Sequence, residues 1–343
     1  MSPLSLAVGF LPVALFLAGL LVMDSYRLLT RRQVAASIAW GALAAVIAFA
    51  IHRALLDRAH LDPLALRRYV APAIEETLKA ALVIALVARA RVGFLVDAAV
   101  HGFAAGAGFA LVENAWYAHA LGEPNPWLWV LRGLGTAVLH GSTTSIVGIV
   151  TKALADRHAG LRSLAALPGL VIAVAVHSAY NHLALNPLAA TALVLLAAPL
   201  TMLVAFEASE RSTRAWVGHG LDRDSELLEL IHTGAIVHTP AGEYLAALRS
   251  RFAGPAVADM LCLLEIRLEL ALRVKGLLLA REAGIEVPPE PQVLANLREL
   301  RFLERSIGPT GRLAMRPLLP DGRERWQIQL LEGQKASPAG RPR

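Results

Sequence analysis

Seven long apolar runs occupy the first 206 residues of this 343-residue chain, and they constrain its fold more than any other feature. About twenty consecutive apolar residues are enough to cross the hydrocarbon core of a bilayer as an α-helix. In lipid, only helices and closed barrels satisfy their own backbone groups, and runs of this length indicate helices. We therefore predict spanning helices over residues 3–23, 34–55, 69–88, 93–121, 127–154, 164–185 and 187–206.

The composition of the chain changes after residue 206. The whole chain is 56% hydrophobic and 17% charged, whereas soluble domains are about 45–50% apolar and about 25% charged. The apolar excess lies before residue 207, and the following hundred or so residues show helical apolar spacing with interleaved charges. We therefore predict an all-α protein with a polytopic membrane bundle over residues 1–206, a soluble helical domain over 207–307 and a flexible tail over 308–343.

Loop charges predict how the bundle sits in the cell membrane. Arginine and lysine gather in the first, third and fifth loops, and the fourth and sixth loops contain neither. Because basic loops stay in the cytoplasm, this pattern places the N-terminus outside and the C-terminal domain in the cytoplasm. The second loop is the exception, since it carries arginines that are partly offset by aspartates. The net charge of +6 fits a multi-pass membrane protein and does not indicate a nucleic-acid partner.

The third apolar run carries charge where charge is expensive. Glu75, Glu76 and Lys79 lie within residues 71–82, and an ionisable side chain at the centre of a spanning helix costs at least ~2.5–3.5 kcal/mol on insertion scales. Such residues face the bundle interior or a watery cavity. Residues four apart share a helix face, so Glu75 aligns with Lys79, while Glu76 is turned about 100° away. The two carboxylates are therefore expected to have different roles.

Three other runs place polar residues at a compatible depth. Glu113 lies near the outer end of the fourth run, His140 nearer the middle of the fifth, and His177 in the outer half of the sixth. Asn181 shares the helix face of His177, because it follows four residues later. Counted at 1.5 Å per residue from the predicted outer ends, these groups and Glu75 fall within a slab about 10–20 Å below the outer surface. Four helices therefore contribute to one polar pocket.

Carboxylates and histidines in a water-accessible pocket suit two mechanisms. A partly desolvated glutamate can take a proton from water, while His or Asn donors stabilise a tetrahedral oxyanion. Alternatively, the pocket holds a divalent metal that activates the water. The candidate ligands for such a metal are Glu76, Glu113, His140 and His177. The chain has a single cysteine, Cys262, which excludes an intrachain disulfide framework and any multi-cysteine metal site.

Four motifs in the apolar runs resemble the PrsW family of intramembrane proteases. They are Glu-Glu-x-x-Lys from Glu75, Gly-Phe-x-x-x-Glu-Asn from Gly108, Arg-x7-His-x2-Thr from Arg132 and His-x3-Asn from His177. Together they span residues 70–185 in the order that the family shows. Each motif is common by itself, and the specificity of the resemblance comes from the four in combination.

The resemblance implies an intramembrane endopeptidase of glutamic type that cleaves membrane-anchored proteins, anti-sigma factors among them, in a first, site-1-type cut. Glu75 is implied as the general base for water, supported by two further carboxylates, while histidines and an asparagine orient water or stabilise the oxyanion. The implied catalytic residues are Glu75, Glu76, Glu113, His140, His177 and Asn181. The implied supporting residues are Lys79, Phe109, Asn114, Arg132 and Thr143. This mechanism requires no cofactor.

Two alternatives remain open at this point. A metal-dependent protease could use the same Glu and His pocket. A non-enzymatic scaffold or transporter could also use a polar core, although the sequence contains no inverted repeat that would favour a transporter. In each case the partners are the lipid bilayer and other membrane proteins. Outside the pocket, His52 lies close to the end of the second run and is expected to be a surface residue.

Overall fold

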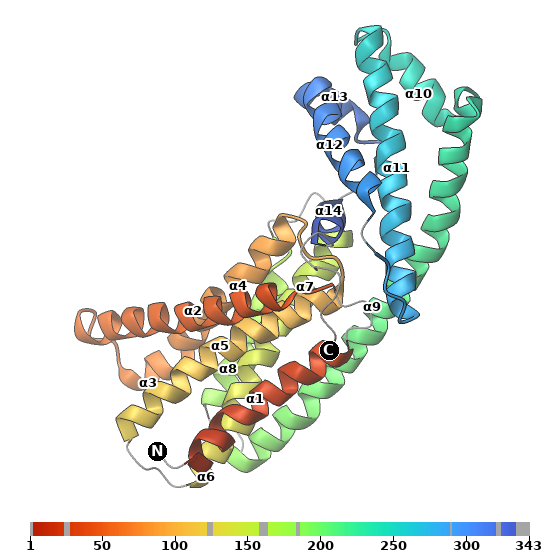
Figure 1. Cartoon of the computed structure of the whole chain (residues 1–343). Helices are drawn as coiled ribbons and strands as arrows, with labels where there is room; N and C mark the ends of the chain where they lie inside the picture. Colours follow the sequence, from red (N-terminus) through yellow and green to blue (C-terminus); the bar gives the residue numbers. More distant parts are fainter. Residues whose placement is uncertain are drawn as a thin grey trace. The chain divides into compact units, whose positions relative to one another are not determined.

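The computed structural model describes residues 3–23, 28–121, 126–157, 164–182, 186–288, 290–319 and 324–333, and every regular element in these ranges is helical (Figure 1). The predicted all-α class is therefore confirmed. Contacts divide the chain into two compact units, Met1–Glu210 and Arg211–Arg343.

The first unit is a bundle of long apolar helices. Its elements are α1 (Pro3–Met23), α2 (Arg31–Asp57), α3 (Pro63–Ala65), η1 (Leu66–Val70), α4 (Ala71–Ala88), α5 (Leu95–Leu121), α6 (Pro126–Val130), η2 (Leu131–Thr136), α7 (Ala137–Arg157), α8 (Leu167–Asn181) and the start of α9 (Pro187–His232). The short elements η1 and η2 are π-helical turns that lead directly into α4 and α7. Helix α9 continues well beyond residue 206, where the sequence predicts the end of the last span.

Within the described residues, four helical stretches are long and apolar enough to cross a membrane: Arg31–Asp57, Leu95–Ala120, Leu131–Arg157 and Pro187–His232. The other three predicted spans correspond to α1, α4 and α8. Helix α4 has 18 residues and carries the three buried charges of the third run, while α8 has 15 residues in the described part of the chain. The membrane-bundle fold is therefore confirmed, and four of the seven predicted spans also meet the requirements of length and composition.

Helix α5 lies at the centre of this bundle and is packed at backbone distance against two neighbours. On one side, a Cβ atom added to Gly106 would overlap the backbone carbonyl of His140 in α7, and Gly102 makes the same close approach to Thr144. On the other side, Gly108 faces the carbonyl of Ile38 in α2. The hydrophobic effect does not favour association between helices that are embedded in lipid. Such helices associate through close packing instead, which small residues allow. These contacts fix where α5 and α7 carry their polar side chains.

The second unit contains the end of α9 and a set of amphipathic helices. Its further elements are η4 (Ala235–His238), α10 (Pro240–Leu248), α11 (Gly254–Glu282), α12 (Pro291–Ser306), α13 (Gly308–Met315) and α14 (Glu324–Gly333). The sequence predicts a flexible tail from residue 308, but α13 and α14 fall in that region and both contact α11. Met315 and Trp326 are buried, so apolar anchors in the Arg-rich stretch hold these two helices in place. Residues 320–323 and 334–343 lie outside the described part.

Candidate active site

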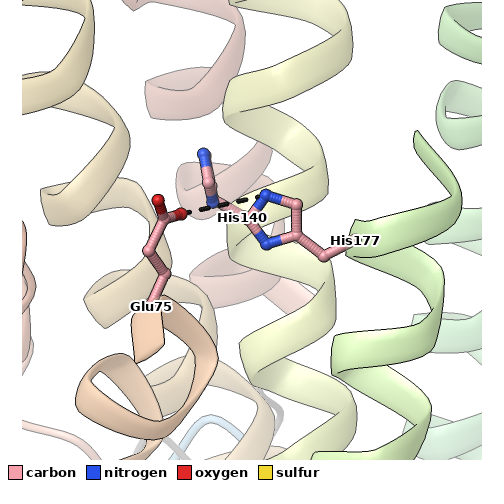
Figure 2. Close-up of side chains that lie close together, drawn as sticks. All are labelled: Glu75, His140 and His177. Carbon is pink, nitrogen blue, oxygen red and sulfur yellow. Dashed lines mark ion pairs between the residues drawn. The ribbon is translucent and has the colours of Figure 1, made fainter. Parts of the chain in front are cut away.

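The side chains of Glu75, His140 and His177 meet inside the first unit, where they extend from α4, α7 and α8 (Figure 2). Each can offer one ligand atom to a common point, since the three atoms lie within 4.8 Å of one another. The Nε2 atom of His177 is 3.8 Å from Oε2 of Glu75. All three residues are buried, with relative exposures of 7%, 1% and 3%. Residues from three helices, up to 102 positions apart in the chain, therefore share one enclosed site.

Glu76 organises the inner side of this cluster through a single oxygen. Its Oε1 accepts hydrogen bonds from Lys79 Nζ at 2.6 Å and from His177 Nδ1 at 2.8 Å, and Thr143 Oγ1 lies 3.1 Å away. A carboxylate only accepts, so the proton of neutral His177 is on Nδ1. The Nε2 lone pair of His177 then points towards Glu75. This carboxylate–histidine arrangement is the one that fixes the tautomer of metal-binding and catalytic histidines.

The hydrogen bonds of His140 also define its tautomer. Lys79 Nζ lies 2.8 Å from Nδ1 of His140, and an ammonium can only donate, so Nδ1 accepts. Neutral His140 therefore carries its proton on Nε2, which donates to Glu113 Oε2 at 3.1 Å. The ring of Phe109 packs against the imidazole, with the ring centroids 5.1 Å apart, and Lys79 Nζ also lies 5.1 Å from the Phe109 ring. Both nitrogens of His140 are thus engaged.

Arg132 holds the side of the site that contains Glu113. It donates from a terminal nitrogen to Glu113 Oε2 at 2.9 Å and from Nε to Asn114 Oδ1 at 3.0 Å. The amide of Asn114 donates in turn to the carbonyl of Gly9 in α1. The guanidinium also lies over the ring of Tyr117, 3.7 Å from its centroid. Arg132 is in the π-helical turn η2, a local widening of the helix that is frequent at functional sites.

The charges of the cluster leave one carboxylate without a cation of its own. Three glutamates face two permanent cations, because Lys79 pairs with Glu76 and Arg132 pairs with Glu113. Oε2 of Glu75 is buried and has no hydrogen-bond partner within the described ranges, and the same holds for Oε2 of Glu76. An unpaired buried carboxylate is costly. A bound cation would remove that cost.

The residues present fit a divalent metal. One carboxylate and two histidines form a donor set typical of catalytic zinc, which keeps a further position open for water or substrate. Glu75 Oε2 and His177 Nε2 are available as they stand, and the Nδ1 of His177 has the carboxylate partner expected of a metal-bound histidine. His140 would have to exchange its contact with Glu113 or with Lys79 for the metal. The sequence-based alternative placed Glu76 and Glu113 among the ligands, whereas the structure groups Glu75 with the two histidines.

The structure brings most of the predicted site residues into one hydrogen-bonded and packed network: Glu75, Glu76, Glu113, His140 and His177, with Lys79, Phe109, Asn114, Arg132 and Thr143 around them. Asn181 differs from this set. Its amide donates to the backbone carbonyl of Arg67 at 3.0 Å, next to the bond from Ser178 to Arg68. These two bonds tie the end of α8 to η1.

One residue near the cluster lies where the sequence does not predict it. His52, in α2, has its Nε2 atom 3.9 Å from Oε1 of Glu75, and its side chain is only 14% exposed. The expectation of a surface residue is therefore wrong. The sequence signal that could have indicated His52 is its predicted depth in the membrane. His52 lies five residues before Asp57, the last residue of α2, and that end of α2 is predicted to face outward. This places His52 at about the predicted depth of Glu75.

Comparison with known proteins gives one match. A family model described as PrsW family intramembrane metalloprotease matches residues 30–206, which is more than half of the chain. The matched range contains every residue of the hydrogen-bonded network named above except Gly9. Neither the curated proteins nor the solved structures gave a significant match.

Proposed function

This chain belongs to the PrsW family of intramembrane metalloproteases, and from that premise we propose that it cleaves membrane-anchored proteins at the Glu75–His140–His177 cluster. The family makes the protein a membrane peptidase. The observation that carries the assignment of the site is the burial of these three side chains within 4.8 Å of one another. The family match favours hydrolysis over a scaffold or a transporter, and the cluster supplies groups that hydrolysis can use.

In the form that we favour, Glu75, His140 and His177 hold a divalent metal. When bound, the metal supplies Lewis-acid activation of the attacking water and of the scissile carbonyl. Glu76 keeps Nδ1 of His177 protonated and thereby directs Nε2 into the site. Lys79 donates to Glu76 and offsets part of the negative charge that three carboxylates bring together. The family description and the free Oε2 of Glu75 support this form.

Glu113 is the proposed proton carrier in the metal-dependent form. Its side chain is 14% exposed and is held by Arg132 at 2.9 Å. If His140 turns its Nε2 to a metal, Glu113 loses that hydrogen bond and keeps the bond to Arg132. Its carboxylate can then accept a proton from the attacking water and deliver it to the leaving amine. Arg132 limits the movement of Glu113 during both transfers.

A second form is supported by the state of His140. Both ring nitrogens of His140 are engaged by Lys79 and Glu113, which is the arrangement expected if no metal binds there. In that form Glu75 is the general base, and its free Oε2 accepts the proton of the water. His140 would stabilise the oxyanion by moving its Nε2–H from Glu113 to the oxyanion. This is the glutamic mechanism, without a cofactor.

The proposed substrate is a single-span membrane protein, for example an anti-sigma factor cut close to the outer surface. The support is the resemblance of the four motifs together with the predicted depth of the pocket. The proposal includes a multi-pass placement in the cytoplasmic membrane of a bacterium, with the N-terminus outside and the second unit in the cytoplasm.

Metal analysis of purified protein tests the proposal and separates the two forms. We expect about one zinc or another divalent ion per wild-type chain, its loss in the His177→Ala variant, and cleavage of a single-span reporter that stops with a chelator and returns when metal is added. The control is His119→Ala, which changes an exposed histidine on α5. Metal-free protein that cleaves the reporter supports the glutamic form. A reporter left uncut by metal-loaded and metal-free protein alike would contradict the proposed activity.

A further inference from the structure

Among the described residues, His52 is a histidine that lies close to the cluster and that neither mechanism above uses. It comes from α2, a helix that contributes no other side chain to the network, and its Nε2 atom faces Glu75 at 3.9 Å. That nitrogen is buried and has no hydrogen-bond partner within the described part of the chain. Glu75 thus lies between two imidazoles, with Oε1 towards His52 and Oε2 towards His177.

A purely structural role does not account for this placement. Buried polar groups in native proteins are almost always paired, and an unpaired one calls for an explanation. A leucine at this position of α2 would fill similar space without a nitrogen to desolvate. The unpaired nitrogen is explained if it forms a hydrogen bond only while the reaction proceeds, with a group that binds metal or takes up a proton. The carboxylate of Glu75 is such a group, and it lies 3.9 Å away.

We infer that His52 is a positioning residue for Glu75, an inference that rests on the proposed function. Its Nε2–H donates to Oε1 of Glu75, either after a small side-chain movement or through one bridging water, since 3.9 Å exceeds a direct hydrogen bond. Fixing Oε1 in this way directs Oε2 at the point shared with His140 and His177. The role is the same whether Oε2 binds a metal or takes a proton from water.

The test compares three substitutions of His52 in the purified full-length protein. His52→Leu removes the nitrogen, His52→Gln restores a donor near the position of Nε2, and His52→Asn places its donor near the position of Nδ1. The control is His119→Leu. For each variant, kcat and KM are measured on the single-span reporter, zinc affinity by equilibrium dialysis of the metal alone, and thermal stability in detergent.

A positioning role predicts a specific pattern. His52→Leu and His52→Asn lose about 10–100-fold in zinc affinity, the effect typical of removing a partner of a metal ligand, and kcat falls by a similar factor while KM stays within about twofold. His52→Gln recovers most of both, and the melting temperature of metal-free His52→Leu is unchanged or higher because an unpaired polar atom is gone. His119→Leu behaves as wild type.

Two outcomes overturn the inference. One is a His52→Leu variant whose kcat and zinc affinity match those of His119→Leu. The other is loss of activity that accompanies a lower melting temperature of the metal-free protein and that His52→Gln does not rescue, which would make His52 a packing residue. The measurements on the wild-type protein test the proposed function separately. If wild type cleaves the reporter without zinc, the metal form is contradicted, and the kcat values of the variants decide whether His52 positions Glu75. If wild type binds zinc but does not cleave, the zinc affinities of the variants decide this.

Discussion

Nδ1 of His177 donates to Oε1 of Glu76 over 2.8 Å, although the two residues are 101 positions apart in the chain. The bond joins α8 to α4 and sets the tautomer of His177. The same oxygen also receives the ammonium of Lys79. Glu76 therefore supports its neighbours in the cluster, and we propose that the adjacent Glu75, whose Oε2 has no hydrogen-bond partner within the described residues, is the group that acts.

Glu75→Gln should abolish cleavage. In either form of the mechanism the variant loses the oxygen that binds a metal or accepts a proton, and positioned acid–base groups contribute about 10²–10⁴-fold to rate. The amide has nearly the same shape, and it removes an unpaired buried charge, so the melting temperature of the metal-free protein should stay the same or rise. Reporter cleavage in membranes and thermal unfolding in detergent measure the two effects. Full activity of Glu75→Gln would show that this carboxylate is not part of the reaction.

Glu76→Gln should instead lower stability as well as activity. The substitution leaves Lys79 charged with no carboxylate beside it, and both side chains are fully buried. Breaking a buried ion pair from one side typically costs about 3–5 kcal/mol. Adding Lys79→Met should recover much of that loss in stability without restoring cleavage, because the glutamine offers Nδ1 of His177 only a neutral amide oxygen in place of a carboxylate, and His140 loses the donor at its Nδ1. A melting temperature for Glu76→Gln equal to that of wild type would contradict the assignment of Glu76 as a support.

The close packing of α5 gives a third prediction. A Cβ atom at Gly106 would overlap the carbonyl of His140, so Gly106→Ala must push α7 away and move His140 itself. Overpacking of this kind usually costs about 1–3 kcal/mol, and we expect cleavage to fall as His140 leaves Lys79 and Glu113. Gly19→Ala in α1 is the matched control, since that position is helical and faces open space. Equal unfolding temperatures for the two variants would argue against backbone contact between α5 and α7.

The cost of charge in a bilayer explains why so much of the pocket could be predicted from the sequence. Glu75, Glu113, His140 and His177 lie in apolar helices, so they are expected to turn inward, and the loop charges predict that they lie at one depth. Pairwise detail could not be obtained in this way. Helix-face spacing distinguished Glu76 from Glu75, but it does not say that one oxygen of Glu76 accepts from residues of two helices.

Asn181 and His52 show where such reasoning fails. Asn181 shares a face with His177, but it is the last residue of α8, where that face has left the pocket and meets the backbone of η1. His52 is close to the end of its apolar run, where a histidine is usually exposed to water. Helix α2 extends to Asp57 and keeps His52 against α4. The direction of a side chain can be read from periodicity, whereas the neighbour in that direction depends on the tertiary fold.

The only cysteine allows the orientation of the chain to be tested. Cys262 is exposed in the second unit, which loop charges predict to be cytoplasmic. We expect a membrane-impermeant maleimide to leave Cys262 unlabelled in intact cells and to label it after permeabilisation. The reactive species is the thiolate. The pKa of the Cys262 thiol is raised, mainly by partial desolvation and to a smaller extent by the nearby carboxylates of Glu265 and Asp259. Labelling after permeabilisation should therefore become faster as the pH is raised above neutral.

A second cysteine position makes this topology experiment decisive. His119→Cys in a Cys262→Ser background carries its thiol near the end of α5 that is predicted to lie outside, and His119 is exposed. This variant should be labelled in intact cells, which shows that the reagent reaches the outer face. If Cys262 is labelled in intact cells and the cysteine of His119→Cys is not, the bundle has the opposite orientation in the membrane. The Glu75–His140–His177 cluster would then open towards the cytoplasmic side, and the proposed cleavage near the outer surface would be excluded.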